Sequence, residues 1–395
     1  MSEARGNGRQ LALALIAFTV TFYGWALLGP LGPEIQEDLE LSDSQLSVAV
    51  AVPVLLGSIM RIPMGVLTER FGGKLVFTWL LGFSILPLVA LAFAHDSFAL
   101  ILVLGFLLGF AGSSFAIGVP FVNRWYPPER QGAALGIYGA GMGGTVLAGL
   151  TAPSIASELS ITAAFLFAAG LIAIVLVIWV VMARDAPVPN KPASMRDPVA
   201  VLGTGIRAWA LVLFYFLAFG GFVAMYLYLP KLLTGVHDLS KTDAGARAAG
   251  FALLAVVGRP LGGVISDRIG AERVLTGCFL AVLVLALGLA VGYESMVALT
   301  FCCLTMALAL GLGTGAVFKL VPVWYPDRVG AVTGVVGAAG GLGGFFPPLV
   351  LGVVGYFVGF VLMAAVALLS LIVLRALRVP ESGVGSARPG MQAQR

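Results

Sequence analysis

Two arginines stand inside long apolar stretches of the sequence, where a charged side chain is costly and is usually functional. Arg61 lies eight residues before Glu69, the acidic residue that closes its stretch. Arg259 lies eight residues before Asp267 in a second stretch. On helices that rise 1.5 Å per residue, both guanidinium groups would lie about 12 Å inside the end of the span. A planar guanidinium offers paired N–H donors that match an oxyanion, so two such groups at equal depth predict a site for a small monovalent anion.

A structural role for the two arginines is the alternative. Pro63 lies two residues after Arg61, and Pro260 directly follows Arg259. Either guanidinium could therefore donate to backbone carbonyls and brace a kink at the proline. The same arrangement occurs twice, which favours the functional interpretation.

The chain that carries these arginines has the composition of a membrane protein. Of its 395 residues, 59% are hydrophobic and 11% are charged, against about 45–50% and 25% in soluble domains. We expect an all-α membrane protein with twelve transmembrane helices in two sets of six. The predicted helices lie near residues 11–32, 44–67, 75–94, 97–121, 131–153, 161–183, 207–230, 243–266, 273–293, 296–322, 329–350 and 353–376.

A proline-rich hydrophilic segment from Arg184 to Arg207 separates the two sets of helices. It predicts four regions. They are an N-terminal six-helix bundle over 1–186, a cytoplasmic linker over 187–206, a C-terminal six-helix bundle over 207–378 and a tail over 379–395.

Lysine and arginine are concentrated in alternate loops, so the positive-inside rule predicts that both termini are cytoplasmic. The loops around 34–43, 94–97, 154–160 and 292–295 contain neither residue. One predicted outer loop, with Lys231, Lys241 and Arg247, breaks the pattern. The first apolar run is too long for a signal peptide, so we expect it to remain as the first helix.

The two halves contain an internal repeat. Trp125-Tyr126-Pro127 recurs 199 residues later as Trp324-Tyr325-Pro326. The second helix of each half is also the same element, because five of its residues recur 198 positions later. These are Arg61, Gly65, Glu69, Arg70 and Gly72, which correspond to Arg259, Gly263, Asp267, Arg268 and Gly270.

Six further motifs are spread over both halves. They are Arg61-Ile62-Pro63, the glycine-rich segments 109–116 and 139–144, Phe219-Gly220-Gly221-Phe222, segment 244–251 and segment 340–347. With these motifs and its two six-helix halves, the whole chain resembles the major facilitator superfamily and, more narrowly, the nitrate/nitrite porter family. The resemblance implies the major facilitator fold of two pseudo-symmetric bundles and transport of nitrate and/or nitrite by alternating access. It also places the two arginines opposite each other across a central cavity.

The resemblance assigns roles to five residues of the predicted site. It implies that Arg61 and Arg259 hold nitrate or nitrite, as the matching arginines of the family do. It also implies that Phe115, Tyr215 and Phe219 line the site and sandwich a flat anion. Tyr215 and Phe219 are four residues apart, so ordinary packing on one helix is the alternative for them.

Glycines in the fifth and eleventh helices are further candidates. Gly139, Gly143 and Gly340 would let the backbone approach the anion or simply a neighbouring helix. The family often carries an asparagine in this part of the fifth helix, where this chain has Met142 and Gly143, and this departure leaves the identity of the anion open. Lys319, near the inner end of the tenth helix, lies on the permeation path or marks the membrane boundary.

Charged residues at the inner ends of the second and eighth helices resemble gating elements of the superfamily. Charge pairs formed in one state and broken in the other would bias the rocking of the two halves, with glycines permitting close helix contact. A loop that merely obeys the positive-inside rule is the alternative. The candidates are Gly65, Glu69, Arg70, Gly263, Asp267 and Arg268.

The predicted spans lack the residues of a proton relay. They contain no Asp or Glu in their cores, and His95 and His237 fall in predicted outer loops. Exchange of nitrate for nitrite is therefore favoured. A proton-coupled symporter and a facilitator for another small monovalent anion, such as a monocarboxylate, stay open as alternatives.

Other classes of protein fit the sequence less well. An enzyme would need a nucleophile with a base, or clustered metal ligands. Cys278, Cys302 and Cys303 lie in apolar segments without the spacing of a metal site. The net charge of +4 is spread over loops, which does not indicate nucleic acid. We therefore expect no enzyme activity and no cofactor or metal. The protein should function as a monomer in the lipid bilayer, with small inorganic anions (nitrate and nitrite) as partners. We expect it in the cytoplasmic membrane of a prokaryote.

Overall fold

The computed structural model describes residues 6–187, 197–325 and 329–377, and these residues form helices joined by turns. Three helical segments have 3-10 or π geometry: η1 (Gly109–Ser113), η2 (Ala140–Gly143) and η3 (Phe216–Gly220). The α-helices are α1 (Gly8–Ala26), α2 (Gly32–Asp38), α3 (Asp43–Phe71), α4 (Gly73–Ala94), α5 (Phe98–Leu108), α6 (Ser114–Asn123), α7 (Pro128–Gly139), α8 (Gly144–Glu158), α9 (Ile161–Met182), α10 (Asp197–Leu202), α11 (Ile206–Tyr215), α12 (Gly221–His237), α13 (Lys241–Ile269), α14 (Ala271–Gly292), α15 (Met296–Trp324) and α16 (Val329–Ala376).

The predicted all-helical membrane fold is confirmed. Within the described ranges, ten helical segments are long and apolar enough to cross a membrane. The other two predicted spans are α1, with 19 residues, and the first part of α16, whose apolar portion is Ala331–Phe346. Three of the spans are composite, because η1, η2 and η3 each join two α-helices into one continuous segment.

Two predicted helix ends differ from the structure, and prolines and glycines explain both. The first span stops at Ala26 instead of residue 32, because Pro30 and Pro33 each remove a backbone donor. The last two spans meet at Gly355, whose φ of 79° favours glycine, instead of near residues 350–353. The predicted linker contains α10, whereas residues 188–196 and the predicted tail lie outside the described residues.

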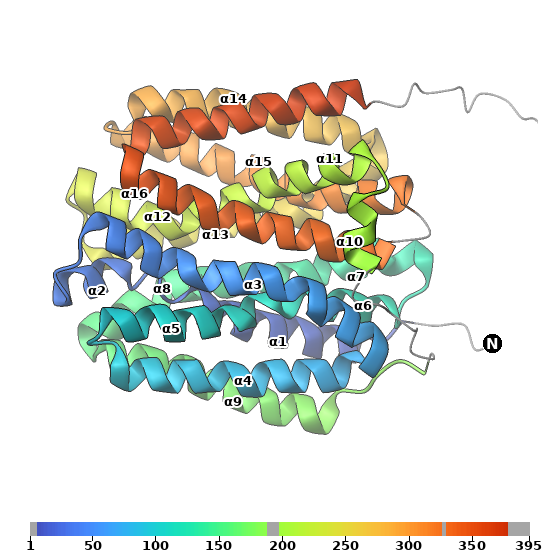
Figure 1. The fold of residues 1–395 in the computed structure, drawn as a ribbon, viewed down its shortest axis with the longest axis horizontal. Coiled ribbons are helices and arrows are strands. Elements are labelled where there is room, and N and C mark those ends of the chain that lie inside the picture. The colour runs from blue at the N-terminus through green and yellow to red at the C-terminus, as the bar shows by residue number, and fades with distance from the viewer. Residues whose placement is uncertain (1–5, 188–196, 326–328, 378–395) are drawn as a thin grey trace, which may run out of the picture.

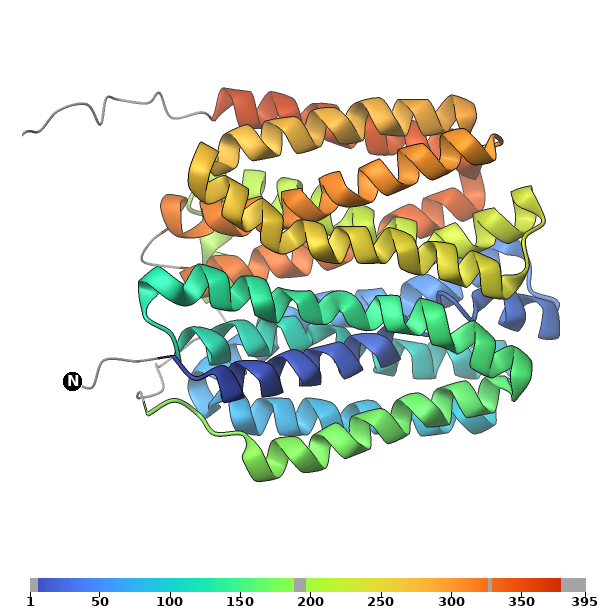
Figure 2. The same cartoon turned by 180° about the vertical axis from the view of Figure 1, so that it is seen from behind.

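The two halves of the chain lie side by side. In Figures 1 and 2, the helices from α1 to α9 lie together below those from α11 to α16. Across the boundary, α3 packs along α16, and α8 packs along α13. The C-terminal ends of α3 and α9 lie on the right in Figure 1, at the face that the sequence predicts to be cytoplasmic.

The predicted repeat also appears in the backbone. Helix α3 ends at Gly72, with φ of 91°, and α13 ends at Gly270, with φ of 88°. Both values lie in the region that glycine tolerates best. The two helices that carry Arg61 and Arg259 therefore turn into the next helix in the same way.

Glycines let the composite spans approach their neighbours closely. A Cβ atom at Gly109 would lie 2.2 Å from the carbonyl oxygen of Pro53 on α3. A Cβ atom at Gly343 would lie 2.3 Å from the carbonyl oxygen of Phe216 in η3. Small residues at such crossings allow backbones to touch, and these contacts fix the helices that carry the central side chains.

Replacing Gly109 with alanine is expected to lower the melting temperature of the purified protein in detergent. The added methyl group would overlap the Pro53 carbonyl oxygen, and overpacking of this kind costs about 1–3 kcal/mol. Gly277→Ala is the matched control, because its new methyl group would meet no atom within 4 Å. The control should melt at the same temperature or higher, since alanine favours a helix over glycine by about 1 kcal/mol. Equal melting temperatures for Gly109→Ala and wild type would contradict the close helix crossing.

Candidate functional site

Arg61 is buried on α3, with 2% of its surface exposed. Its Nε donates to the carbonyl oxygen of Gly112 at 3.3 Å, and its Nη1 donates to that of Gly337 at 2.5 Å. Its Cζ lies 4.8 Å from the centre of the Phe219 ring. Gly112 belongs to the N-terminal half, whereas Gly337 and Phe219 belong to the C-terminal half. Arg61 therefore connects the two halves of the molecule.

Arg259 is buried on α13, with 5% of its surface exposed. Its Cζ lies 4.5 Å from the centre of the Phe115 ring and 5.8 Å from that of Phe318. Its Nη1 lies 3.4 Å from the sulfur of Met142, and a thioether is a weak hydrogen-bond acceptor. Phe115 and Met142 come from the N-terminal half. Each arginine thus lies on an aromatic ring supplied by the opposite half.

Four aromatic rings form a continuous row between the two guanidinium groups. The Phe219 and Tyr215 rings stack, with centres 5.3 Å apart and planes 5° apart. Tyr215 then meets Phe318 edge to face at 4.8 Å, and Phe318 lies 5.6 Å from Phe115. The structure therefore brings together all three predicted aromatic residues. Sequence reasoning missed Phe318, because a phenylalanine in an apolar helix carries no signal, and it singled out the neighbouring Lys319 by its charge.

The hydroxyl of Tyr215 is buried without a hydrogen-bond partner among the described residues. The side chain is fully buried and lies close enough to Arg61 for an electrostatic interaction. Buried polar groups in native proteins are nearly always hydrogen-bonded. This hydroxyl is therefore available to an additional acceptor beside the arginine.

Two of the three predicted glycines lie against side chains of the site. A Cβ atom at Gly340 would lie 2.3 Å from Cδ1 of Tyr215. A Cβ atom at Gly139 would lie 3.0 Å from Nε of Arg259. The nearest neighbour of a Cβ atom at Gly143 would be Val256, at an ordinary 3.9 Å. The role of Gly143 at the site stays a prediction.

Lys319 pairs with Asp267, one of the predicted gating residues. Both residues lie in the C-terminal half, on α15 and α13. The lysine ammonium therefore has a carboxylate partner at the end of the span. The ion pair of Asp267 is with Lys319, and no ion pair between Asp267 and Arg268 accompanies it among the described residues.

The other predicted gating residues lie at the corresponding end of α3. The backbone carbonyl of Glu69 accepts a hydrogen bond from Nη2 of Arg124 at 3.0 Å. The guanidinium of Arg70 lies over the ring of Phe71, with Cζ 5.2 Å from the ring centre. Whether these residues act as a gate stays a prediction.

Close helix contact at the second predicted gate involves both Gly263 and the neighbouring Gly262. A Cβ atom at Gly263 would meet no atom within 4 Å, whereas one at Gly262 would lie 2.1 Å from the carbonyl oxygen of Leu312. At Gly65 the nearest atom, the carbonyl oxygen of Ala116, would be 3.9 Å away. A Cβ atom at Gly315 on α15 would lie 2.9 Å from the backbone nitrogen of Gly263, so both glycines belong to this crossing, and the gating role of Gly263 stays a prediction.

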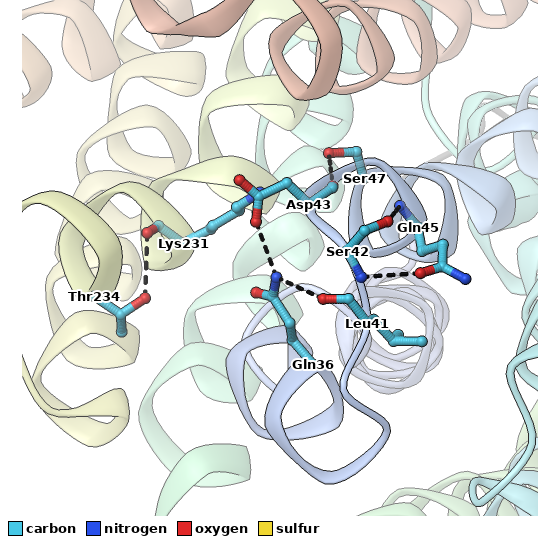
Figure 3. Close-up of polar contacts among 8 residues, drawn as sticks. All are labelled: Gln36, Leu41, Ser42, Asp43, Gln45, Ser47, Lys231 and Thr234. Atoms are coloured by element: carbon cyan, nitrogen blue, oxygen red, sulfur yellow. Dashed lines mark hydrogen bonds and ion pairs between the residues drawn. The ribbon is translucent and has the colours of Figure 1, made fainter.

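The cations that broke the loop charge pattern are all paired with carboxylates. Lys231 on α12 lies 2.9 Å from Asp43 at the start of α3, and Figure 3 shows the two side chains facing each other. Lys241 lies 2.5 Å from Glu37 on α2. Both ion pairs join the N-terminal half to the C-terminal half, at the face that the sequence predicts to be outer. The positive charges of this loop therefore hold the two halves together.

Polar neighbours strengthen these ion pairs. The Gln36 amide donates to Asp43 at 3.0 Å and to the Leu41 carbonyl at 3.1 Å (Figure 3). The hydrogen bond and the charge of Lys241 hold the pKa of Glu37 below its ordinary value of 4.5. A carboxylate with a lowered pKa makes its full contribution to stability when the pH is above its ordinary pKa. This contribution is lost as the pH falls through the lowered pKa. The contact therefore persists at neutral pH.

Removing the carboxylate of Asp43 is expected to destabilise the protein, and removing Lys231 as well should restore part of the loss. Asp43→Asn leaves a largely buried ammonium without its counter-charge, whereas the double variant with Lys231→Met does not. A double-mutant cycle on the free energy of unfolding in detergent should give a coupling of about 1 kcal/mol or more. The exposed pair Arg247–Asp243 is the control, with about 0.5 kcal/mol or less. Equal couplings for the two pairs would contradict a special role for Lys231.

Together, the fold and the central site define a membrane transporter. Two repeated helical halves enclose a buried cationic site, and each half supplies part of it. The model of the Major Facilitator Superfamily matches residues 14–321 and 211–394. The chain belongs to this superfamily.

Three curated relatives are similar to this chain over nearly their whole length. The "Probable nitrate/nitrite transporter NarK2" of Mycobacterium tuberculosis (strain ATCC 25618 / H37Rv) is 40% identical, over 93% of this chain and 95% of the relative. The "Nitrite extrusion protein" of Bacillus subtilis (strain 168) is 37% identical, over 92% and 93%. The "Probable nitrate transporter NarT" of Staphylococcus carnosus (strain TM300) is 35% identical, over 95% and 97%.

Solved structures of more distant proteins share the fold. The human organic anion transporter MFSD10 superposes with a TM-score of 0.73 at 17% sequence identity, over 93% of this chain and 99% of that one. A bacterial homologue of the human lysosomal transporter Spinster, in an inward-facing and occupied conformation, gives 0.66 at 18%, over 93% and 94%. At these identities the likeness shows the fold alone.

Proposed function

We propose that this protein carries nitrate and nitrite across the membrane by alternating access and exchanges one anion for the other. The observation that carries the proposal is the pair of buried arginines, each lying on an aromatic ring of the opposite half. The printed names of the curated relatives support the choice of nitrate and nitrite.

The contacts of Arg61 and Arg259 favour a small, flat, monovalent anion. Their acceptors among the described residues are two carbonyl oxygens and one thioether, without a carboxylate. The site therefore has an excess of positive charge that an anion would neutralise. The ring faces beside the guanidinium groups suit a planar ligand, and the hydroxyl of Tyr215 would donate to one of its oxygens.

Access to this site would alternate between the two faces of the membrane. The ion pairs Lys231–Asp43 and Lys241–Glu37 join the halves at the predicted outer face, and they would break when that face opens. Rocking of bundles 1–186 and 207–378 would then form and break contacts at the predicted inner gate. In this proposal the gate consists of Gly65, Glu69, Arg70, Gly263, Asp267 and Arg268, and both termini are cytoplasmic.

Exchange is favoured over proton symport because the described spans offer no buried proton carrier. The charged residues that are buried within the described ranges are Arg61, Lys231 and Arg259, and no Asp, Glu or His is among them. A proton relay in a membrane normally uses such groups. The anion itself then remains as the species that moves in both directions.

Uptake of labelled nitrate and nitrite into liposomes that contain the purified protein tests this function. We expect fast uptake when the interior holds nitrite or nitrate, slow uptake when it holds chloride, and no acceleration by a pH gradient. Arg61→Gln should abolish uptake. Arg207→Gln is the control and should not, because the wild-type Arg207 guanidinium lies near the Trp324 ring and not at the central site. Uptake driven by the pH gradient would contradict exchange. Transport of formate or acetate without nitrate or nitrite would instead favour a monocarboxylate carrier.

Tyr215→Phe is expected to weaken nitrate binding about ten- to hundredfold, since a hydrogen bond to a charged group contributes about 1.5–3 kcal/mol. The melting temperature should not fall, because the buried hydroxyl has no described partner to lose. Tyr226→Phe is the control, because its hydroxyl donates to the Thr145 carbonyl at 2.7 Å. The control should melt earlier and bind nitrate normally. Unchanged affinity in Tyr215→Phe, measured by titration of the purified protein, would remove the hydroxyl from the site.

A further inference from the structure

A cavity of about 310 Å³ lies where α11 begins and α15 ends, at the face that the sequence predicts to be cytoplasmic. The start of α11 lies beside α10, on the right in Figure 1. Two of the lining residues belong to the repeated Trp-Tyr-Pro motif, which the proposed transport of nitrate does not use. The described lining residues are Thr204, Gly205, Ile206, Arg207, Trp324 and Tyr325.

Arg207 gives this cavity a positive charge. The side chain is exposed. Its guanidinium lies over the Trp324 ring, with Cζ 5.9 Å from the ring centre, and forms no ion pair among the described residues. The hydroxyls of Thr204 and Tyr325 lie 3.3 Å apart and form a polar edge. The described lining contains no carboxylate, so the cavity offers a cation and hydroxyl groups to an anionic ligand.

The equivalent place in the N-terminal half is covered. Arg9 is the second residue of α1, as Arg207 is of α11, and the two stand at the offset of the internal repeat. Before α1, a Cβ atom at Gly6 would lie 2.8 Å from Cε1 of Tyr126. Before α11, a Cβ atom at Gly205 would meet no atom within 4 Å. The chain therefore covers the tyrosine of the first motif and leaves that of the second accessible.

The starts of the two helices differ in the same sense. At α1, the side chain of Asn7 accepts a hydrogen bond from the backbone nitrogen of Gln10 at 3.2 Å. At α11, the capping residue is Gly205, which has no side chain to accept one. Unsatisfied N–H groups at a helix start attract phosphate groups. They would add to the attraction of Arg207 for an anion in the same cavity.

The side of the cavity that Ile206 forms is apolar. Ile206 is 62% exposed, and Trp209, one turn further along α11, is 53% exposed. The indole N–H of Trp209 donates to the Leu202 carbonyl at 3.1 Å. Exposed tryptophans at the end of a span are typical of the boundary between lipid and water. The cavity therefore combines a cationic part with an apolar rim, which suits a ligand that has a charged head and a hydrocarbon chain.

We propose that this cavity binds the headgroup of an anionic phospholipid of the cytoplasmic leaflet. Arg207 would pair with the phosphate, and the hydroxyl of Tyr325 would donate to one of its oxygens. The acyl chains would lie along Ile206 and Trp209. Basic pockets between spans on this side of a membrane bind such headgroups. The lipid would join the start of α11 to the end of α15 and touch no residue of the central arginine site. This inference goes beyond the proposed transport and does not depend on it.

Titration of the delipidated protein in detergent with dihexanoyl-phosphatidylglycerol tests this site. A ligand that binds the folded state raises the melting temperature by mass action, so the titration gives an apparent dissociation constant. We expect Arg207→Gln to weaken binding at least about tenfold, which corresponds to about 1.4 kcal/mol. Arg9→Gln is the matched control, because Arg9 has the same position on its helix without the open cavity. The control should bind the lipid within about twofold of wild type.

Thr204→Phe is an independent test, because it fills the cavity and keeps the charge of Arg207. It should weaken binding by at least about the same tenfold. Equal weakening in Arg207→Gln and Arg9→Gln would overturn the proposal, because general attraction to the charged face would then explain the binding. Wild-type protein that does not bind the lipid, or cavity variants that bind it normally, would also overturn it.

Two further ligands identify what the cavity accepts. Dihexanoyl-phosphatidylcholine carries the same phosphate without net charge and should bind much more weakly. Equal affinity for the two lipids would contradict a site for an anionic headgroup. Inorganic phosphate at the same concentrations should leave the melting temperature unchanged. If it binds as tightly as the lipid and its binding also requires Arg207, the site takes a soluble phosphate and the lipid proposal is wrong.

Discussion

The rest of the structure depends on one constraint: two guanidinium charges are buried where the two halves of the molecule meet. A cation in an apolar interior needs acceptors, ring faces or an opposite charge. Each arginine obtains acceptors and ring faces from the opposite half, Arg61 from Gly337 and Phe219, and Arg259 from Met142 and Phe115. The composite helices and their glycines follow from this requirement. They bring backbone carbonyls and ring faces close enough to the charges, in a region where straight helices with large side chains would keep them apart.

The sequence predicts the helices and the two arginines well, because hydrophobicity, periodicity and isolated charges are local signals. It misses what depends on three-dimensional packing. Phe318 is one of many phenylalanines in apolar stretches until the fold places it between Tyr215 and Phe115. At the crossing with α15, the Cβ direction of Gly262 points at the neighbouring backbone and that of Gly263 does not, since adjacent residues are rotated by about 100° around a helix. Spacing alone does not indicate which of two adjacent glycines faces the neighbour.

The loop with Lys231 and Lys241 shows a second feature that the sequence alone does not predict, the pairing of its charges. Counting charges treats each loop separately, so three cations on the predicted outer side conflict with the positive-inside rule. Their partners Asp43 and Glu37 lie about two hundred residues away in the chain and become visible only in the folded protein. A loop charge that is paired across the halves contributes to holding them together as well as to topology. The same side chains can therefore oppose the topological rule and still be favourable in the native structure.

The reciprocal placement of charge and ring has a consequence for how such a chain can evolve. Each arginine is encoded in one half of the gene, and the ring beneath it is encoded in the other. Neither half contains a complete unit of the site, so a duplicated half that assembled with itself would lack the present combination of partners. A substitution at an arginine or a ring on one side therefore changes the surroundings of its partner on the other. The two halves are free to diverge over most of their surfaces, but at the centre they must change together.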